Sequence, residues 1–401
     1  MRIMEDKLYY VNRQLERLGE EDQAYLRAQV DGTDWSIMEA LKHIGGEESR
    51  GAFAPLPAME CAEIEERRAE LHAVGLEAIR SGKVGAVLLA GGQGTRLGYD
   101  QPKGTVDIGI TRELYIFQCL INNLQKVTKE AGCPVPLYIM TSAGNHQDTV
   151  SFFESHGYFG YDSAYVKFFV QEMVPAVDYQ GRVLMRDEKN LAMSPNGNGG
   201  WFVSMVRAGL LADLHDRGIQ WLNIFAVDNV LQQIADPVFI GATIDSGCES
   251  GSKVVRKAEP QERVGVLCSE DGRPSIVEYY EMTDEMIHSR KENGDLSYGF
   301  GVILNYLFRV DKLEEIVKES MPVHVVEKKV PYMDESGEFH KPQEPNAYKF
   351  ETLVLDMVHM MGSCLPYEVV REKEFAPIKN REGIDSIASA RELLKANGVT
   401  L

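Results

Sequence analysis

The chain has 401 residues, enough for one large domain or for two to three smaller ones, and an apolar fraction of 44% excludes global disorder. Its formal net charge is −19, and the sequence contains no dense block of Lys and Arg. This balance argues against nucleic-acid binding and is typical of a soluble cytoplasmic enzyme.

Cysteine usage and hydropathy exclude several further classes. The six cysteines never show CxxC spacing, so we expect reduced thiols and neither a disulfide framework nor a zinc ribbon. The first ten residues, MRIMEDKLYY, lack the apolar core of a signal peptide, and no stretch reaches about 18 consecutive apolar residues. We therefore expect no membrane association and a cytoplasmic location.

Residues 1–80 are predicted to form a helical N-terminal region. Apolar residues recur at helical spacing in LYYVNRQLERLGEEDQAYLRAQV (8–30) and CAEIEERRAELHAVGLEAIRSG (61–82). Between them, GAFAPLPAME (51–60) contains a Gly and two Pro, which are typical of a loop. The pattern of this region indicates no chemistry of its own.

Residues 81–380 are predicted to form the main domain, an α/β core with a mainly parallel sheet. The short apolar run VGAVLLA (84–90) is typical of a buried parallel strand. Helices and strands then alternate, as they do around parallel sheets, in the segments 114–132, 136–142, 149–157, 166–173, 204–218 and 221–229. Shorter segments within 252–310 are expected to be antiparallel strands, and residues 381–401 are expected to contain one short helix.

Residues 88–98 read LLAGGQGTRLG, and PKG follows at 102–104. A dinucleotide fingerprint needs GxGxxG opening a helix, whereas the glycines here give GxGxxxG with a proline ahead. A Walker A loop needs a GK pair, which this segment lacks. A plain glycine turn remains possible on spacing alone. Arg96 inside the loop and Lys103 after it favour a phosphate cradle, in which uncluttered backbone N–H groups and two cations bind the anion.

This loop with its PKG resembles the nucleotide loop of the UDP-sugar pyrophosphorylases, and most closely that of the eukaryotic-type UDP-N-acetylglucosamine pyrophosphorylases. Further segments resemble the same family in a consistent order across residues 84–380: YIMTS, FFVQEM, MSPNGNGGWF, FAVDNVL, KVVRKAEPQERVGV, VEYYEM, PNAYKFE and YEVVREKEFAPIKN. An ordered series of this length is far more specific than one glycine loop.

The resemblance implies a doubly wound, Rossmann-like nucleotidyltransferase that converts UTP and a hexose 1-phosphate to UDP-sugar and pyrophosphate, with Mg²⁺ as cofactor. No nucleophilic side chain is needed, because a sugar 1-phosphate is already anionic near neutral pH. We therefore expect direct in-line transfer, in which the enzyme positions the two anions and neutralises their charge. The alternative is a regulatory protein that keeps the nucleotide-binding fold with little turnover.

The same resemblance implies roles for individual residues. The catalytic cations are Arg96, Lys103 and Lys379, and the metal ligand is Asp228. The nucleotide-binding residues are Gly91, Gly92, Gly94, Gln171, Gly197 and Gly199, with Gln171 on the uracil. The sugar-binding residues are Gly265, Glu278, Asn305 and Lys349. Without the family, most of these would be interpreted as structural, but Asp228 ends an apolar strand, where α/β proteins bind ligands.

The sequence departs from the acetylglucosamine-type enzymes at three places. Val302 stands where they carry the Asn of a GN pair, and Leu353 and Leu355 stand where they carry two Phe. Each of these changes is expected to alter hexose choice by ~1–3 kcal/mol, so N-acetylglucosamine, glucose and galactose all stay open as the sugar. The family's C-terminal domain is largely absent after Lys379, which predicts a monomer.

Overall fold

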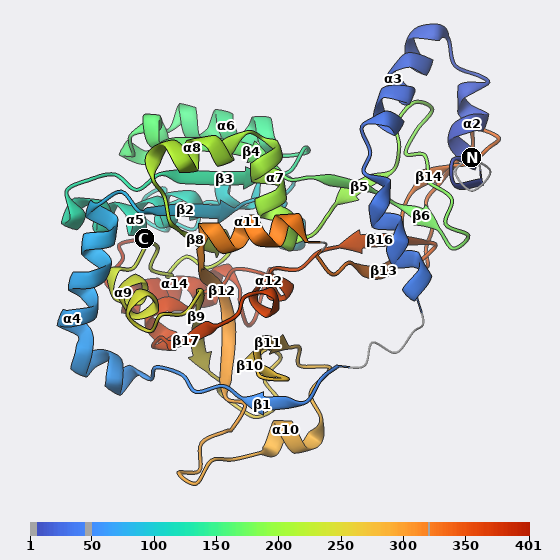
Figure 1. Ribbon diagram of the computed structural model, residues 1–401. Coiled ribbons are helices and arrows are strands. Elements are labelled where there is room, and N and C mark those ends of the chain that lie inside the picture. Colours follow the sequence, from blue (N-terminus) through green and yellow to red (C-terminus); the bar gives the residue numbers. More distant parts are fainter. Residues whose placement is uncertain (1–5, 45–49, 320) are drawn as a thin grey trace. The chain divides into compact units, whose positions relative to one another are not determined.

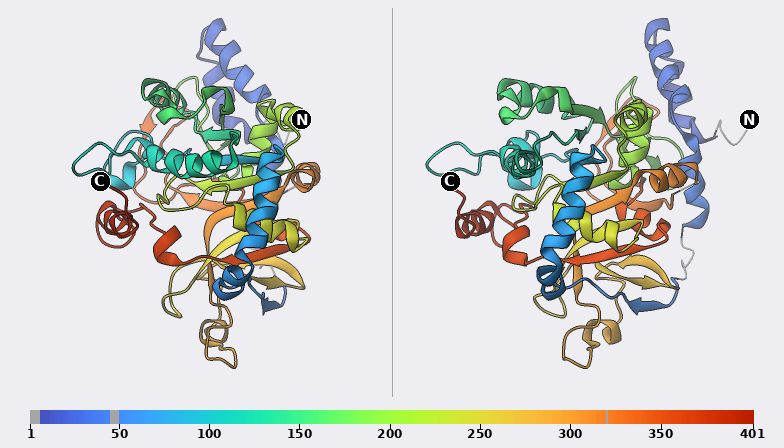
Figure 2. Two further views of the ribbon diagram at one scale, coloured as in Figure 1. Left: turned by 90° about the vertical axis from the view of Figure 1, so that its left-hand side faces the viewer. Right: turned by 60° about the vertical axis from the view of Figure 1, so that its left-hand side comes forward.

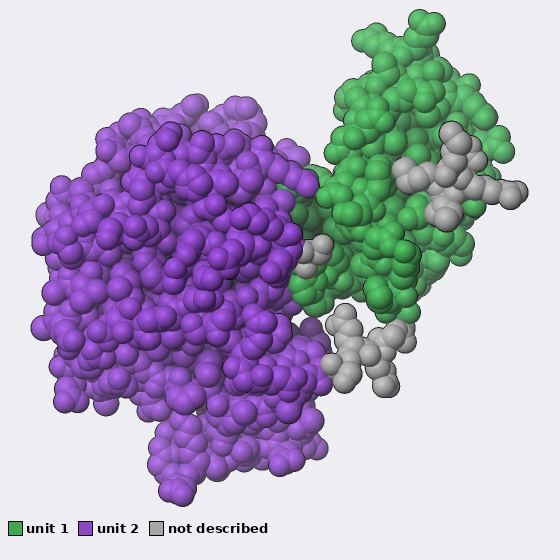
Figure 3. All heavy atoms as spheres, in the orientation of Figure 1, with its two compact units in different colours: residues 1–49, 171–201, 321–354 green, residues 50–170, 202–320, 355–401 purple. Residues whose placement is uncertain are grey.

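The computed structural model describes residues 6–44, 50–319 and 321–401, and these residues form two compact units (Figure 3). Unit 1 takes its residues from 1–49, 171–201 and 321–354, and unit 2 takes them from 50–170, 202–320 and 355–401. The division differs from the predicted ranges 1–80, 81–380 and 381–401. Packing between segments far apart in sequence determines it, and sequence order does not show such packing.

Unit 2 is built on a mixed sheet to which the described residues contribute ten strands. Its parallel part runs in the order β4, β3, β2, β8, which span Val166–Val170, Leu137–Thr141, Val84–Leu89 and Trp221–Ala226 (Figure 1). Every residue of β2 is buried, as expected of a strand covered on both faces. The predicted α/β fold is confirmed.

The sheet continues through β12 (Phe300–Arg309), which runs antiparallel to β8. On its other side β12 pairs with β9 (Ser250–Arg256), and β9 pairs in parallel with β17 (Cys364–Glu368). The carboxyl ends of the parallel strands and the beginning of β12 consequently lie at one edge of the sheet, which we call the carboxyl edge.

Three shorter strands extend the sheet from the beginning of β12. They are β10 (Val266–Glu270), β11 (Arg273–Val277) and β1 (Phe53–Pro55), and all of their pairings are antiparallel. The antiparallel strands predicted within 252–310 are therefore confirmed, although β9 has a parallel neighbour as well. β1 lies in a segment that was predicted to be a loop.

Helices pack on both faces of this sheet. On one face, alternate strand residues such as Ala86 and Leu88 share a core with α4 (Cys61–Arg80), α5 (Ile116–Ala131) and α9 (Pro237–Asp245). On the other face, the Tyr138 hydroxyl of β3 donates a 2.6 Å hydrogen bond to Asp213 of α8, which spans Leu210–Arg217.

Helix α4 packs against α9 (Figures 1 and 2), and the two backbones approach each other closely at Gly75 and Gly241. A Cβ atom on Gly75 would lie 1.8 Å from the carbonyl oxygen of Pro237, and one on Gly241 would lie 1.8 Å from that of Leu71. Only glycine permits such an approach at both positions. This contact explains why residues 61–80 belong to unit 2 and not with the preceding helices.

The remaining helices near this sheet are short: α6 (His146–Ser155), α7 (Trp201–Arg207), α10 (Asp284–His288), α11 (Val310–Lys318), α12 (Val354–Met360), α13 (Arg371–Glu374) and α14 (Ile387–Ala396). The helix predicted over 204–218 is divided into α7 and α8 at Gly209, whose φ of +77° is left-handed. The helix predicted after residue 380 is α14. Among the described helices, none has the length and apolar character needed to cross a membrane.

Unit 1 has its own core. Helices α2 (Tyr9–Leu15) and α3 (Glu20–Asp31) pack on small antiparallel sheets, with Leu26 and Phe350 among the buried residues. The strands are β6 (Val177–Asp178), β13 (His324–Lys328) and β16 (Ala347–Glu351) in one sheet, β5 (Met173–Pro175) with β7 (Met193–Pro195), and β14 (Tyr332–Met333) with β15 (Phe339–His340). The strand predicted over 166–173 is β4 and β5, separated where the chain leaves unit 2.

Candidate functional site

The glycine loop follows β2 at the carboxyl edge and folds back on itself. The Gly94 N–H donates to the carbonyl of Gln101 (3.1 Å), and the Lys103 N–H donates to that of Gly92 (3.3 Å). A Cβ atom on Gly94 would lie 2.8 Å from the Tyr99 carbonyl oxygen, so only glycine fits there. The loop is thus a fixed backbone structure, and it presents Arg96 on a short 3-10 turn, Thr95–Leu97, with its side chain exposed.

A second loop holds the glycine loop in place. The side-chain amide of Asn145 donates to the carbonyl oxygens of Ala90 (3.0 Å) and Gly92 (3.4 Å). Its carbonyl oxygen accepts from the Ser142 N–H (2.7 Å). Asn145 is almost fully buried and follows β3, so the loops after two neighbouring strands are tied together at the carboxyl edge.

Lys103 sits next to a glycine that packs on an aromatic ring. A Cβ atom on Gly104 would lie 2.2 Å from the ring of Phe117, so the PKG segment can lie on α5 only with glycine at this position. Burial lowers the pKa of Lys103, while the negative charge of Asp228 opposes this effect. Two nearby cations lower the pKa further, and they are Lys379 and Arg96. Asp228, Lys379 and Arg96 therefore lie close enough to Lys103 to influence its charge, and we call these four residues the electrostatic cluster.

Asp228 and Lys379 are joined through their backbones. The Ile378 N–H donates to the Asp228 carbonyl (2.9 Å), and the Val230 N–H donates to the Ala376 carbonyl (3.3 Å). Asp228 lies two residues after β8, and Lys379 follows α13. The VDN and APIK segments therefore form a short antiparallel ladder that holds the backbones of Asp228 and Lys379 close together at the carboxyl edge.

A second corner of unit 2 contains two predicted sugar-binding residues. A Cβ atom on Gly265 would lie 3.4 Å from Glu278 Oε1 and 3.5 Å from a methyl group of Val302. The Val302 N–H donates to the Gly265 carbonyl (2.9 Å). Burial, followed by the nearby Glu281, raises the pKa of Glu278. Gly265, Glu278 and Val302 thus meet at the beginning of β12, which lies at the carboxyl edge.

Asn305, which was predicted to bind the sugar, lies in the interior of the sheet. Its side chain is fully buried in β12, with its amide group donating to Gln232 Oε1 (3.3 Å) and to the Gln233 carbonyl (3.2 Å). Its carbonyl oxygen accepts from Asn223 Nδ2 (2.8 Å). The side chain has no exposed atom with which to contact a sugar, so the structure contradicts the predicted sugar contact.

Four other predicted residues lie in unit 1, where backbone contacts bring their segments together. A Cβ atom on Gly197 would lie 2.2 Å from the Thr352 carbonyl oxygen, and the Gly199 N–H donates to the same oxygen (2.8 Å). Thr352 follows β16, which carries Lys349. Asn196 bonds to the backbone of Glu172, the residue after Gln171. These glycines are therefore required by the close approach of residues 352–353, and their contact with a nucleotide stays a prediction.

A model of the family described as "UTP--glucose-1-phosphate uridylyltransferase" matches residues 55–399. This protein belongs to that family. The human "UDP-N-acetylhexosamine pyrophosphorylase-like protein 1" is 39% identical over 82% of this chain and 67% of its own length. The Saccharomyces cerevisiae "UDP-N-acetylglucosamine pyrophosphorylase" is 40% identical over 78% of this chain and 68% of its own. The chain thus spans about two thirds of the length of the curated relatives it matches.

The fold is also similar to solved structures. The crystal structure of the Trypanosoma brucei "uridine diphosphate N-acetylglucosamine pyrophosphorylase", solved with an inhibitor, is 27% identical with a TM-score of 0.81. The similarity covers 96% of this chain and 81% of that one. Together with the family match, it confirms the recognition made from the ordered sequence segments.

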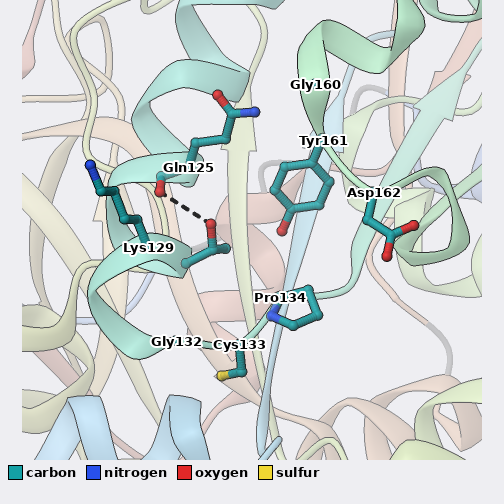
Figure 4. Close-up of a pocket in the computed structure, with 9 residues that line it drawn as sticks. Gln125, Lys129, Gly132, Cys133, Pro134, Gly160, Tyr161 and Asp162 are labelled. Carbon is teal, nitrogen blue, oxygen red and sulfur yellow. Dashed lines mark hydrogen bonds between the residues drawn. The ribbon is translucent and has the colours of Figure 1, made fainter.

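Two other features of this uridylyltransferase-family chain are not part of the predicted site. A surface hollow lies between the end of α5 and the turn before β4 (Figure 4), lined by Gln125, Thr128, Lys129, Gly132, Cys133, Pro134, Gly160, Tyr161 and Asp162. It is at the amino ends of β3 and β4, away from the carboxyl edge. In unit 1, Asp334 accepts from His340 Nε2 (2.7 Å) and from two backbone N–H groups, so it serves the β14–β15 turn.

The sequence interpretation missed the residues that support the site. Asn145 precedes a helix and carries no motif of its own. Asn229, Lys253 and Glu374 lie inside segments that resemble the family, but their type and spacing do not distinguish supporting residues from ligand-binding ones. Burial is the distinguishing property, and all four side chains are buried.

Proposed function

We propose that this chain transfers the uridylyl group of UTP to a hexose 1-phosphate, which gives UDP-sugar and pyrophosphate. The observation that carries the proposal is the electrostatic cluster of Arg96, Lys103, Asp228 and Lys379 at the carboxyl edge. In a chain with a net charge of −19, three cations gathered around Lys103 and one acid favour the binding of anionic substrates. The names of the human and yeast relatives support the same reaction.

Each residue of the cluster has a distinct task in this mechanism. The backbone of Gly91, Gly92 and Gly94 receives the nucleotide phosphates, while Arg96 and Lys103 neutralise their charge. Lys379 approaches the sugar phosphate, and its neighbour Asp385, 3.7 Å away, orients the ammonium. The hexose phosphate oxygen then attacks the α-phosphorus in line, and pyrophosphate leaves from the opposite side without a covalent enzyme intermediate.

A divalent cation fits this site. Mg²⁺ prefers oxygen ligands and is commonly held by one or two carboxylates together with substrate phosphates. Asp228 is a half-buried carboxylate two residues after β8, and it lies near the cations that would receive the phosphates. Bound there, the cation would polarise phosphoryl oxygens and offset their charge.

We propose N-acetylglucosamine 1-phosphate as the sugar substrate, with Gly265 and Glu278 facing the sugar hydroxyls. The support comes from the curated relatives, whose names specify N-acetylhexosamine or N-acetylglucosamine. Val302 gives this corner a methyl surface where an amide is expected, so glucose and galactose are the competing hexoses. The monomeric state and the cytoplasmic location stay predictions.

The test is pyrophosphate release from UTP with and without Mg²⁺, using a panel of N-acetylglucosamine, N-acetylgalactosamine, glucose and galactose 1-phosphates. Lys103→Met and Asp228→Asn should each abolish release. The matched controls Lys126→Met and Asp245→Asn, at exposed or half-exposed sites away from the cluster, should retain it. If none of these sugar 1-phosphates gives pyrophosphate release although UTP binds measurably, the result would contradict the proposal and support the regulatory alternative.

A further inference from the structure

We infer that Lys253 is a positioning residue, whose buried ammonium ties together the two loops that carry Asp228 and Lys379. The inference rests on the proposed function, because it concerns the geometry of that site. Lys253 lies in the middle of β9 and its side chain is fully buried. Nothing about the proposed chemistry requires a cation at this depth, so its presence calls for a structural cause.

The ammonium has three acceptors from two loops. Lys253 Nζ lies 2.9 Å from Asp236 Oδ2 and 2.6 Å from Glu374 Oε2. It also donates to the Gln233 carbonyl over 3.4 Å. Asp236 and Gln233 end the loop that follows β8 and contains Asp228, whereas Glu374 ends α13, five residues before Lys379. All three ammonium hydrogens are therefore used to connect these loops.

The connection continues to the site itself. Glu374 is the residue whose carbonyl accepts from Asn229 Nδ2 (2.7 Å), and Asn229 Oδ1 accepts from the Ala376 N–H (2.9 Å). The next bond along the same ladder joins the Ile378 N–H to the Asp228 carbonyl (2.9 Å). A shift of Glu374 would therefore move Asp228 and Lys379 relative to each other.

Charge explains why a lysine is suited to this position. Asp236 and Glu374 are both nearly fully buried, and two unpaired carboxylates at this depth would repel each other. Asp236 also caps α9 through the Val238 N–H (3.0 Å), so its orientation is fixed by a second bond. One ammonium between the two acids holds both loops, whereas an apolar side chain could hold neither.

The experiment compares Lys253→Met and the double variant Lys253→Met/Glu374→Gln with the wild-type chain. The single variant leaves two facing carboxylates and is at risk of not folding. The double variant keeps the formal charge of the cluster at −1 and still lacks the tie. The matched control is Asp213→Asn, which removes a carboxylate bonded to Tyr138, Lys167 and Arg217 at the amino ends of β3 and β4.

Amide hydrogen exchange is the readout that does not depend on activity. In the double variant, the amides of Val230 and Ile378 should exchange at least tenfold faster than in the control at equal global stability. We also expect kcat for pyrophosphate release to fall about 10- to 100-fold, with a higher half-saturating Mg²⁺ concentration, as for residues that orient a metal ligand. The control should change kcat by less than twofold.

The outcomes separate this inference from the proposed function. Unchanged exchange at Val230 and Ile378, or a kcat loss no larger than in Asp213→Asn, would overturn the positioning role while leaving the uridylyltransferase proposal intact. If the wild-type chain releases no pyrophosphate with any sugar, the proposed function fails. The exchange measurement then still decides whether Lys253 holds the two loops together.

Discussion

Asn223 donates a 2.8 Å hydrogen bond from its side-chain amide to Asn305 Oδ1 inside the sheet of unit 2. Asn305 in turn donates to Gln232 Oε1 (3.3 Å), and Gln232 donates to the carbonyls of Ala226 (2.7 Å) and Asn229 (2.9 Å). This buried series of amides runs from β12 to the loop that carries Asp228. Asn305 therefore supports, through Gln232, the loop that carries the predicted metal ligand Asp228.

Replacing Asn305 by Leu should destabilise the protein without changing its choice of sugar. The substitution removes the donor to the buried Gln232 Oε1 and leaves Asn223 Nδ2 with the Tyr306 carbonyl (2.9 Å) as its remaining acceptor. One buried polar group without a partner costs ~1–3 kcal/mol. We expect urea denaturation to show a loss of at least that size in the free energy of unfolding. The ratio of kcat/KM values for two sugar 1-phosphates should stay the same, whereas a changed ratio at unchanged stability would restore Asn305 as a sugar contact.

Asn305 also shows how far the sequence could predict this protein. The order of strands and helices follows from short continuous apolar runs and from apolar residues at helical spacing, and it led to the correct α/β fold. The glycine loop and Asp228 were predictable at the carboxyl edge because each follows an apolar strand, and parallel strands deliver their following loops to the same edge. The roles of Lys379, Gly265 and Glu278 were predicted from the family resemblance alone. The place of Asn305, in the middle of β12, was not predictable, because the sequence pattern is the same whether the amide faces a ligand or the interior.

The division of the chain into two units could not be predicted from the sequence either, because it depends on packing between distant segments. Helix α4 and the helices before it have similar composition, yet α4 packs in unit 2 through Gly75 and Gly241. The complementarity of two glycines 166 positions apart (241 − 75) is a property of packing and not of local pattern. The left-handed break at Gly209 was missed because an isolated glycine is tolerated within a helical pattern.

Replacing Asn145 by Ala should weaken UTP binding. The change removes the donor to the carbonyls of Ala90 and Gly92 and frees the glycine loop from the loop after β3. We expect a roughly tenfold rise in the KM for UTP, since one net hydrogen bond to the loop is worth ~0.5–1.5 kcal/mol. Gln147→Ala, an exposed position two residues further on, is the control. Equal KM values in the two variants would show that the glycine loop is rigid without Asn145.

The charge state of Lys103 should depend on Asp228. Burial lowers the pKa of Lys103, and the carboxylate of Asp228 partly restores it by favouring the charged ammonium. Asp228→Asn should therefore lower the pKa of Lys103 further, and Arg96→Gln should raise it by removing a nearby positive charge. The rate of Lys103 acetylation by acetic anhydride, followed by mass spectrometry against pH, reports the neutral amine. If both variants shift the pKa of Lys103 in the same direction, the opposite effects assigned to Asp228 and Arg96 would be contradicted.

Acid should destabilise unit 2 through Glu270. Hydrogen bonds from Arg50, at 2.9 and 3.1 Å, lower the pKa of Glu270 to about 2. Because the folded-state pKa is depressed, this stabilisation is complete above the unfolded pKa of ~4.3 and is lost as the pH falls toward ~2. In Glu270→Gln, the free energy of unfolding should fall less between pH 5 and pH 2.5 than in wild type. Glu292→Gln, which is exposed, should behave like wild type.

Val302 should determine part of the sugar preference. Its side chain faces the corner formed by Gly265 and Glu278, and its backbone is fixed by the 2.9 Å bond to the Gly265 carbonyl. The strand is bulged between Val302 and Tyr306, with Leu304 in a left-handed conformation, so the position of this side chain is set by the irregular strand and not by a flexible loop.

Val302→Asn would replace a methyl group by an amide of similar size in that corner. We expect the kcat/KM ratio for N-acetylglucosamine 1-phosphate over glucose 1-phosphate to rise about tenfold, because one polar contact to a substrate contributes ~1–3 kcal/mol to discrimination. Val302→Leu adds volume without a polar group and controls for shape. If the Asn and Leu variants change the ratio equally, the size of the corner and not its hydrogen bonding selects the sugar.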